Sequence, residues 1–160
     1  MDNILFLDID GVLNSMRSSV AYGTYNKLDE ISVKLLNEIC LDCGCGIVIS
    51  STWRKNHKPH KLVGILQGHG VDKFPMNEML KLDCFYTPVI NTHGSIRGNE
   101  IEQWLKEYGG CNYVILDDDS DMTDEQKQNH FVHVNGEVGI TVQNMLDVKK
   151  LFKKQVLGEV

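Results

Sequence analysis

Three short apolar runs along the chain share one pattern, a polar or acidic residue directly after the last apolar position: residues 4–7 before Asp8, residues 47–49 before Ser50, and residues 113–116 before Asp117. Runs rich in β-branched and aromatic residues are typical of strands buried on both faces of a parallel sheet. A fourth short run, residues 130–134, also predicts a strand. The chain therefore favours a mostly parallel sheet.

Between these runs, apolar residues recur with the spacing of amphipathic helices. The predicted helices cover residues 29–42, 59–70, 98–108 and 141–152. Asp29 and Thr141 are suitable N-caps, and Pro59 suits a helix first turn. Because strands alternate with helices, the pattern predicts an α/β fold with right-handed crossovers.

Two segments have no clear period. We expect residues 14–27 to form a hairpin or flexible flap between the first strand and the first helix. Residues 80–96 leave room for one more strand. The gap from Asn14 to about Asp29 fits only a flap, and the gap from Arg54 to Ile96 fits a helix, a strand and loops, so neither leaves room for a large inserted domain. A length of 160 residues favours a single domain over 1–160.

In an open parallel sheet, ligands bind beyond the carboxyl ends of the strands. The acidic and hydroxyl residues after the three runs should therefore meet at one edge. Asp8, Asp118 and either Asp117 or Asp121 would repel one another unless a cation lay among them. Carboxylate oxygens are the ligands that Mg²⁺ prefers, so the sequence predicts a Mg²⁺ site.

The same edge offers groups suited to a phosphoryl group. Ser50 or Ser51 supplies a hydroxyl, and Arg97 supplies a guanidinium near a helix N-terminus. One carboxylate could attack phosphorus and form an aspartyl-phosphate. A second carboxylate two residues on, as in Asp8 and Asp10, could protonate the leaving oxygen and later deprotonate water.

With these residues in view, the chain resembles the haloacid dehalogenase (HAD) superfamily. The sequence DIDGVLN is similar to the family's first motif, IVISST to its second, the arginine of RGNEIEQWL to its third, and VILDDDSD to its fourth. The motifs occur in the family's order. The resemblance implies a three-layer, Rossmann-like fold with a central, mostly parallel sheet flanked by helices, here with a minimal cap or none.

The resemblance also implies a role for each matching residue. Asp8 would be the nucleophile and a metal ligand, and Asp10 the general acid/base and a metal ligand through its backbone carbonyl. Ser50 would bind the phosphoryl group, Arg97 would stabilise it, and Asp118 would bind metal. Family phosphatases have the second aspartate, so Asp10 favours hydrolysis of phosphate esters.

Two pairs of neighbours compete for these roles. Ser50 is preferred over Ser51 because it directly follows the apolar run. Asp118 is preferred over Asp117 because the family's ligand usually lies one residue beyond the strand. After the second motif, Trp53 favours packing over substrate stacking. Arg54 is equally consistent with a solvated loop and a substrate contact.

The near absence of a cap suggests an open site and a large phosphorylated substrate, such as a macromolecule. The formal net charge of −6 argues against binding to a nucleic-acid backbone, although a local basic patch would override it. No apolar run is long enough to span a bilayer, so we expect a cytoplasmic protein without a membrane partner. The alternatives are a non-catalytic module that binds phosphate or metal, and a phosphatase of nucleic-acid ends.

Overall fold

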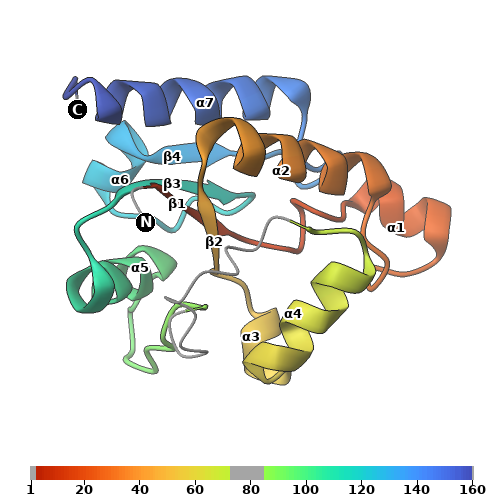
Figure 1. Cartoon of the computed structure of the whole chain (residues 1–160). Coiled ribbons are helices and arrows are strands. Elements are labelled where there is room, and N and C mark those ends of the chain that lie inside the picture. The colour runs from red at the N-terminus through yellow and green to blue at the C-terminus, as the bar shows by residue number, and fades with distance from the viewer. Residues whose placement is uncertain (1–2, 73–84, 160) are drawn as a thin grey trace.

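The computed structural model describes residues 3–72 and 85–159, and a four-stranded sheet lies at its centre (Figure 1). The strands are β1 (Asn3–Leu7), β2 (Gly46–Ile49), β3 (Asn112–Asp117) and β4 (Phe131–His133). Their order is β2-β1-β3-β4, and all three pairings are parallel. The four strands expected from the apolar runs are confirmed.

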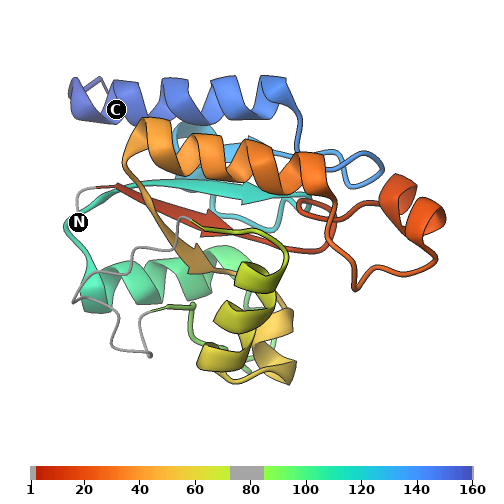
Figure 2. The ribbon, with the colours of Figure 1, turned by 45° about the vertical axis from the view of Figure 1, so that its right-hand side comes forward.

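Helices cover both faces of the sheet, so the fold has three layers, as expected. They are α1 (Met16–Tyr22), α2 (Glu30–Cys43), α3 (Trp53–Asn56), α4 (Pro59–Gly68), α5 (Arg97–Tyr108), α6 (Asp124–Asn129) and α7 (Val142–Val156). Helices α2 and α7 lie together on one face, and α5 lies on the other (Figures 1 and 2).

The two covered faces explain why β1 is apolar at every position from Ile4 onward. Leu5 and Leu7 belong to the core beneath α2 and α7, whereas Ile4 and Phe6 belong to the core beneath α5. Phe6 packs edge-on against Trp104 of α5, with ring centroids 5.2 Å apart. Successive side chains of a strand point to opposite faces, so a strand between two helix layers buries every residue.

Side-chain caps fix the starts of the two longest described helices, α2 and α7. Asp29 accepts a hydrogen bond from the backbone N–H of Ser32, 3.1 Å away, and Thr141 caps α7. Both N-caps were expected from the sequence. Helix α5 begins at Arg97, one residue earlier than predicted.

The segment between β1 and α2, expected to form a hairpin or flexible flap, contains helix α1. Ser15 caps this helix in a reciprocal pair with Ser18, and the Met16 N–H donates to the carbonyl of Gly136 at 3.1 Å. In the second irregular segment, residues 80–84 lie outside the described part of the chain. From residue 85 to residue 96, Tyr86 forms a single bridge with Ile49 in place of a strand.

The carboxyl ends of the three neighbouring strands meet, as a parallel sheet requires. The N–H of Asp8 donates to the carbonyl of Leu116 at 3.1 Å, and the N–H of Ser50 donates to the carbonyl of Leu7 at 2.8 Å. These two bonds continue the sheet pairing one residue past the strands. They hold the first polar residues after β1 and β2 side by side.

Candidate active site

Three carboxylates converge at this edge of the sheet. Asp8, Asp117 and Asp118 each offer one oxygen to a group of atoms that lie within 4.8 Å of one another. Asp8 is 7% exposed and Asp117 is 1% exposed. Asp8 directly follows β1, and Asp117 is the last residue of β3. The structure thus brings both of the competing aspartates, Asp117 and Asp118, to the same point.

Burial makes this cluster electrostatically costly. Desolvation raises the pKa of Asp8 well above its usual range, and Arg97 opposes that shift. Desolvation likewise raises the pKa of Asp117, and the neighbouring Asp8 charge raises it further. Like charges in a buried site disfavour ionisation, and a bound cation would reverse this preference.

The three carboxylates fit Mg²⁺, which prefers oxygen ligands to nitrogen or sulfur ligands. The backbone around Asp118 is unusually close to its carboxylate. A Cβ added at Gly11 would lie 2.1 Å from Asp118 Oδ2, and one at Gly136 would lie 2.7 Å away. Gly11 also has a φ of 81°, which allows the chain to turn directly after Asp10. The absence of a Cβ at both glycines therefore leaves the space that the Asp118 carboxylate occupies.

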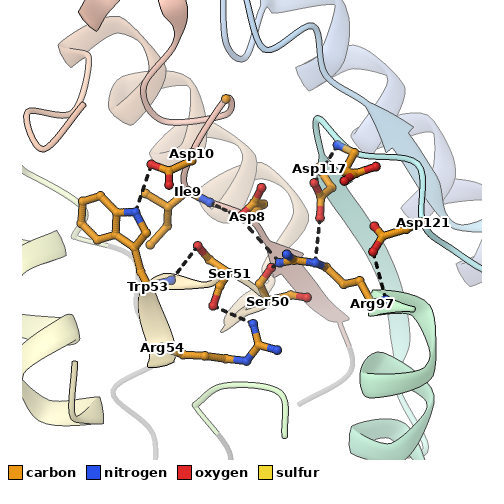
Figure 3. A network of polar contacts seen from close by, with 12 residues as sticks. Asp8, Ile9, Asp10, Ser50, Ser51, Trp53, Arg54, Arg97, Asp117 and Asp121 are labelled. Carbon is orange, nitrogen blue, oxygen red and sulfur yellow. Dashed lines mark hydrogen bonds and ion pairs between the residues drawn. The ribbon is translucent and has the colours of Figure 1, made fainter. Parts of the chain in front are cut away.

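Asp10 points away from the acidic cluster and is held by two donors. The indole Nε1–H of Trp53 donates to Asp10 Oδ1 at 3.0 Å (Figure 3). The Asn14 side-chain amide donates to the same oxygen at 2.8 Å. Asn14 also accepts a bond from the Gly11 N–H at 2.8 Å, which fixes the turn. The two aspartates of the first motif therefore occupy different surroundings, although only Ile9 separates them.

The two serines of the second motif face different partners. The Ser51 hydroxyl accepts a bond from the Trp53 N–H at 3.3 Å. The Ser50 hydroxyl is buried and finds no hydrogen-bond partner among the described residues. A buried hydroxyl without a partner costs free energy unless a ligand satisfies it. Its state is consistent with the preference for Ser50 over Ser51.

Arg97 lies between the acidic cluster and the end of β2. Its Nη1 is 3.7 Å from Asp8 Oδ1, its Nε is 3.7 Å from Asp117 Oδ2, and it donates to the carbonyl of Ser50. Burial alone would lower its pKa, but the surrounding carboxylates outweigh this and raise the pKa. Asp121 accepts the Arg97 backbone N–H at 3.2 Å, so it anchors α5 and lies outside the cluster of three.

Comparison with known proteins gives the family of the chain. A family model described as the HAD domain in Swiss Army Knife RNA repair proteins matches residues 4–145. The chain belongs to this family. No curated protein and no solved structure matched the chain. The superfamily expected from the four motifs is thereby confirmed, and this membership supports a function of the hydrolase and phosphatase type. No described helix has both the length and the apolar character needed to cross a bilayer.

This HAD domain contains one further buried pair that the sequence left undecided. The Arg54 guanidinium forms an ion pair with Glu100, with side chains 2% and 11% exposed, respectively. Arg54 also donates to the carbonyl of Ser51 at 2.6 Å, and Glu100 accepts the N–H of Ile90 at 3.2 Å. Arg54 is therefore neither solvated nor free for substrate. It ties the loop after β2 to the first turn of α5, where Arg97 lies.

Proposed function

We propose that this chain is a Mg²⁺-dependent phosphatase that removes a terminal phosphoryl group from RNA. The observation that carries the proposal is the contrast between Asp8 and Asp10. Asp8 shares its buried site with Asp117 and Asp118, whereas Asp10 is held apart by Trp53 and Asn14. Two carboxylates in such different surroundings are suited to two different tasks.

Asp8 would attack phosphorus, so that an oxygen–phosphorus bond forms to Asp8 while the bond from phosphorus to the ester oxygen breaks. Asp10 would give its proton to the departing oxygen. In the second step, Asp10 would take a proton from water as that water attacks the aspartyl-phosphate and releases Asp8 with inorganic phosphate.

Three further groups would complete the site. Asp8, Asp117 and Asp118 would hold Mg²⁺, which when bound offsets negative charge on the phosphoryl oxygens. The Ser50 hydroxyl, which lacks a partner among the described residues, would donate to one of those oxygens. Arg97 would contribute its charge from the other side of the cluster, where two carboxylates already orient it.

The substrate class rests on the family description, which names RNA repair proteins. The net charge of −6 pointed away from nucleic acid, but it averages over the whole chain. Locally, residues 53–71 contain no aspartate or glutamate, and the exposed Lys55, Lys58 and Lys61 are three of the 16 lysines and arginines. This segment directly follows the second motif. It supports the alternative of a nucleic-acid-end phosphatase.

The test is release of phosphate from oligoribonucleotides that carry a 3′- or a 5′-phosphate, and from a small aryl phosphate, in Mg²⁺ and in EDTA. Turnover should require Mg²⁺ and vanish in Asp8→Asn. Asp119→Asn is a matched control, because Asp119 is exposed beside the cluster. A domain that binds phosphate and Mg²⁺ but turns over none of these esters would instead be a non-catalytic module.

The role of Asp10 is tested by the leaving group. Removing a general acid typically costs about 10²–10⁴-fold when the leaving oxygen needs a proton. Asp10→Asn should therefore lose far more activity on an alkyl phosphate than on an aryl phosphate, whose leaving group departs without protonation. Equal losses on both esters would contradict this role.

A further inference from the structure

A hollow of about 270 Å³ is lined by Asn26, Trp53, Asn56, His57 and Ile65. Trp53 connects the hollow with the first-motif turn that carries Asp10, because the Trp53 Nε1–H donates to Asp10 Oδ1 at 3.0 Å. In Figure 3, Trp53 and Asp10 lie together on one side of Asp8, and Arg97 lies on the other.

The side chains of the hollow combine aromatic faces with amide groups. The Trp53 and His57 rings lie 5.8 Å apart at an interplanar angle of 30°. His57 Nδ1 lies 3.0 Å from the Trp53 carbonyl oxygen, which fixes the imidazole. The side-chain amides of Asn26 and Asn56 hydrogen-bond to no other described residue, and both asparagines are exposed. Stacking faces with adjacent donors and acceptors are what unpaired nucleobases require of a protein.

The position of Asp10 indicates which part of the substrate would lie near the hollow. A general acid must lie within hydrogen-bond reach of the leaving oxygen, so the leaving group extends away from phosphorus on the Asp10 side. In a phosphorylated nucleic-acid end, this leaving group is the terminal nucleoside. Its base would then fall next to the indole of Trp53.

The chain beyond the hollow is basic. Lys55, Lys58 and Lys61 are exposed, and residues 53–71 contain no acidic residue. Helix α3, which carries Lys55, and helix α4, which begins at Pro59, lie side by side in both ribbon views (Figures 1 and 2). A strand that leaves the hollow over these helices would meet positive charge suited to its phosphates.

We propose that this hollow, which we call the Trp53 hollow, binds the base of the terminal nucleotide, and that Lys55, Lys58 and Lys61 contact the phosphates of the adjoining strand. The inference rests on the proposed function and adds how that site recognises its substrate. Trp53, which the sequence assigned to packing, gains a second role as a stacking surface.

Binding of the base is measured by tryptophan fluorescence in Asp8→Asn with Mg²⁺, so that no turnover is needed. Only Trp53 and Trp104 emit, and Trp104 is 4% exposed in the core. Adenosine 3′- or 5′-monophosphate should quench the emission and bind about tenfold or more tightly than ribose 5-phosphate, in line with base–aromatic stacking. Quenching should disappear in Trp53→Phe.

His57→Ala and Asn56→Ala should each reduce this preference for nucleotide over ribose phosphate. His69→Ala is the matched control, because His69 Nδ1 makes the same kind of contact with a helix carbonyl, that of Ile65, at 2.8 Å. His69 does not line the hollow, so its variant should keep the preference. Equal affinity for adenosine monophosphates and ribose phosphate, without quenching, would overturn the base site.

The lysines are tested by the salt dependence of oligoribonucleotide binding. For single strands, the slope of log K against log salt is negative, and each lost phosphate contact reduces its magnitude by about 0.7. Replacing Lys55, Lys58 and Lys61 by alanine should therefore reduce the magnitude of the slope by about 2. A control triple variant replaces three other exposed lysines, Lys106, Lys127 and Lys150. Equal slopes in the two triple variants would overturn the strand path.

These outcomes separate the inference from the proposed function. Mg²⁺-dependent hydrolysis with the same kcat/KM for nucleotides and ribose phosphate would leave the phosphatase intact and refute the Trp53 hollow. Nucleotide-specific quenching without hydrolysis of any ester would support the hollow and refute the phosphatase.

Discussion

Glu100→Gln is the most informative single substitution outside the catalytic cluster. It removes the partner of Arg54, whose side chain is 2% exposed, and leaves a buried positive charge unpaired. Breaking a buried ion pair on one side costs about 3–5 kcal/mol. Glutamine keeps one acceptor oxygen for the Ile90 N–H, so we expect the lower end, about 3 kcal/mol. In a chain of this size that corresponds to a fall in Tm of about 6–12 °C.

The same substitution should reduce activity in the part of the protein that remains folded. Arg54 holds the carbonyl of Ser51, and Glu100 lies in the first turn of the helix that begins at Arg97. The Arg54–Glu100 pair joins the loop after Ser50 to the helix turn that contains Arg97. When the pair is broken, Ser50 and Arg97 are positioned less precisely relative to each other and to a bound phosphoryl group. We therefore expect kcat/KM to fall at a temperature well below the variant's Tm.

Thermal unfolding followed by circular dichroism, with turnover measured in parallel, checks both expectations. Arg54→Met combined with Glu100→Gln removes both charges, so the double variant should lose less stability than the two single variants added together. Asp42→Asn is the control, because the Asp42–Lys149 pair lies at the surface and its loss should leave Tm close to that of the wild type. A Glu100→Gln protein with unchanged Tm, or strictly additive losses, would refute the reasoning.

Two further predictions concern the acidic cluster. Without metal, the raised pKa values of Asp8 and Asp117 mean that the folded state binds more protons than the unfolded state above about pH 4, so Tm in EDTA should fall as pH rises toward 8. Mg²⁺ should raise Tm more at pH 8 than at pH 5.5, and a Tm that rises with pH in EDTA would contradict the shifts. Gly136→Ala should displace the Asp118 carboxylate and raise the Mg²⁺ concentration needed for half-maximal turnover, whereas Gly64→Ala, whose Cβ would meet nothing within 4 Å, should not.

Much of the fold follows from local sequence because its elements are long and buried. The strands read as apolar runs since both of their faces are covered, and α2 and α7 have both a cap and an apolar stripe. The short helices have weaker signals. Helix α1 has 7 residues and buries only Ser18, so it shows no apolar period. It is held instead by backbone contacts to the distant segment around Gly136.

The candidate site is also only partly predictable from local sequence. Sequence spacing suffices to place Asp8, Asp118 and the two serines at one edge of the sheet, because the carboxyl ends of parallel strands meet there. It does not reveal partners that the fold brings together across long separations. Trp53 lies 43 residues from Asp10, and Arg54 lies 46 residues from Glu100. The only sequence signal for these contacts was the presence of a tryptophan and an arginine directly after the second motif. Neither residue type indicates which distant residue it will contact.

The net charge illustrates why an average over the chain is a poor guide to its substrate. At physiological ionic strength, charges further apart than about 8 Å are largely screened from one another. A strand end bound at Asp8 therefore responds to nearby groups, and not to acidic residues on the far side of the molecule. The acids of the site would be offset by Mg²⁺ and Arg97, while the segment 53–71 carries only positive charge. An acidic protein can thus present a surface that attracts RNA, provided that its basic residues are concentrated where the strand leaves the site.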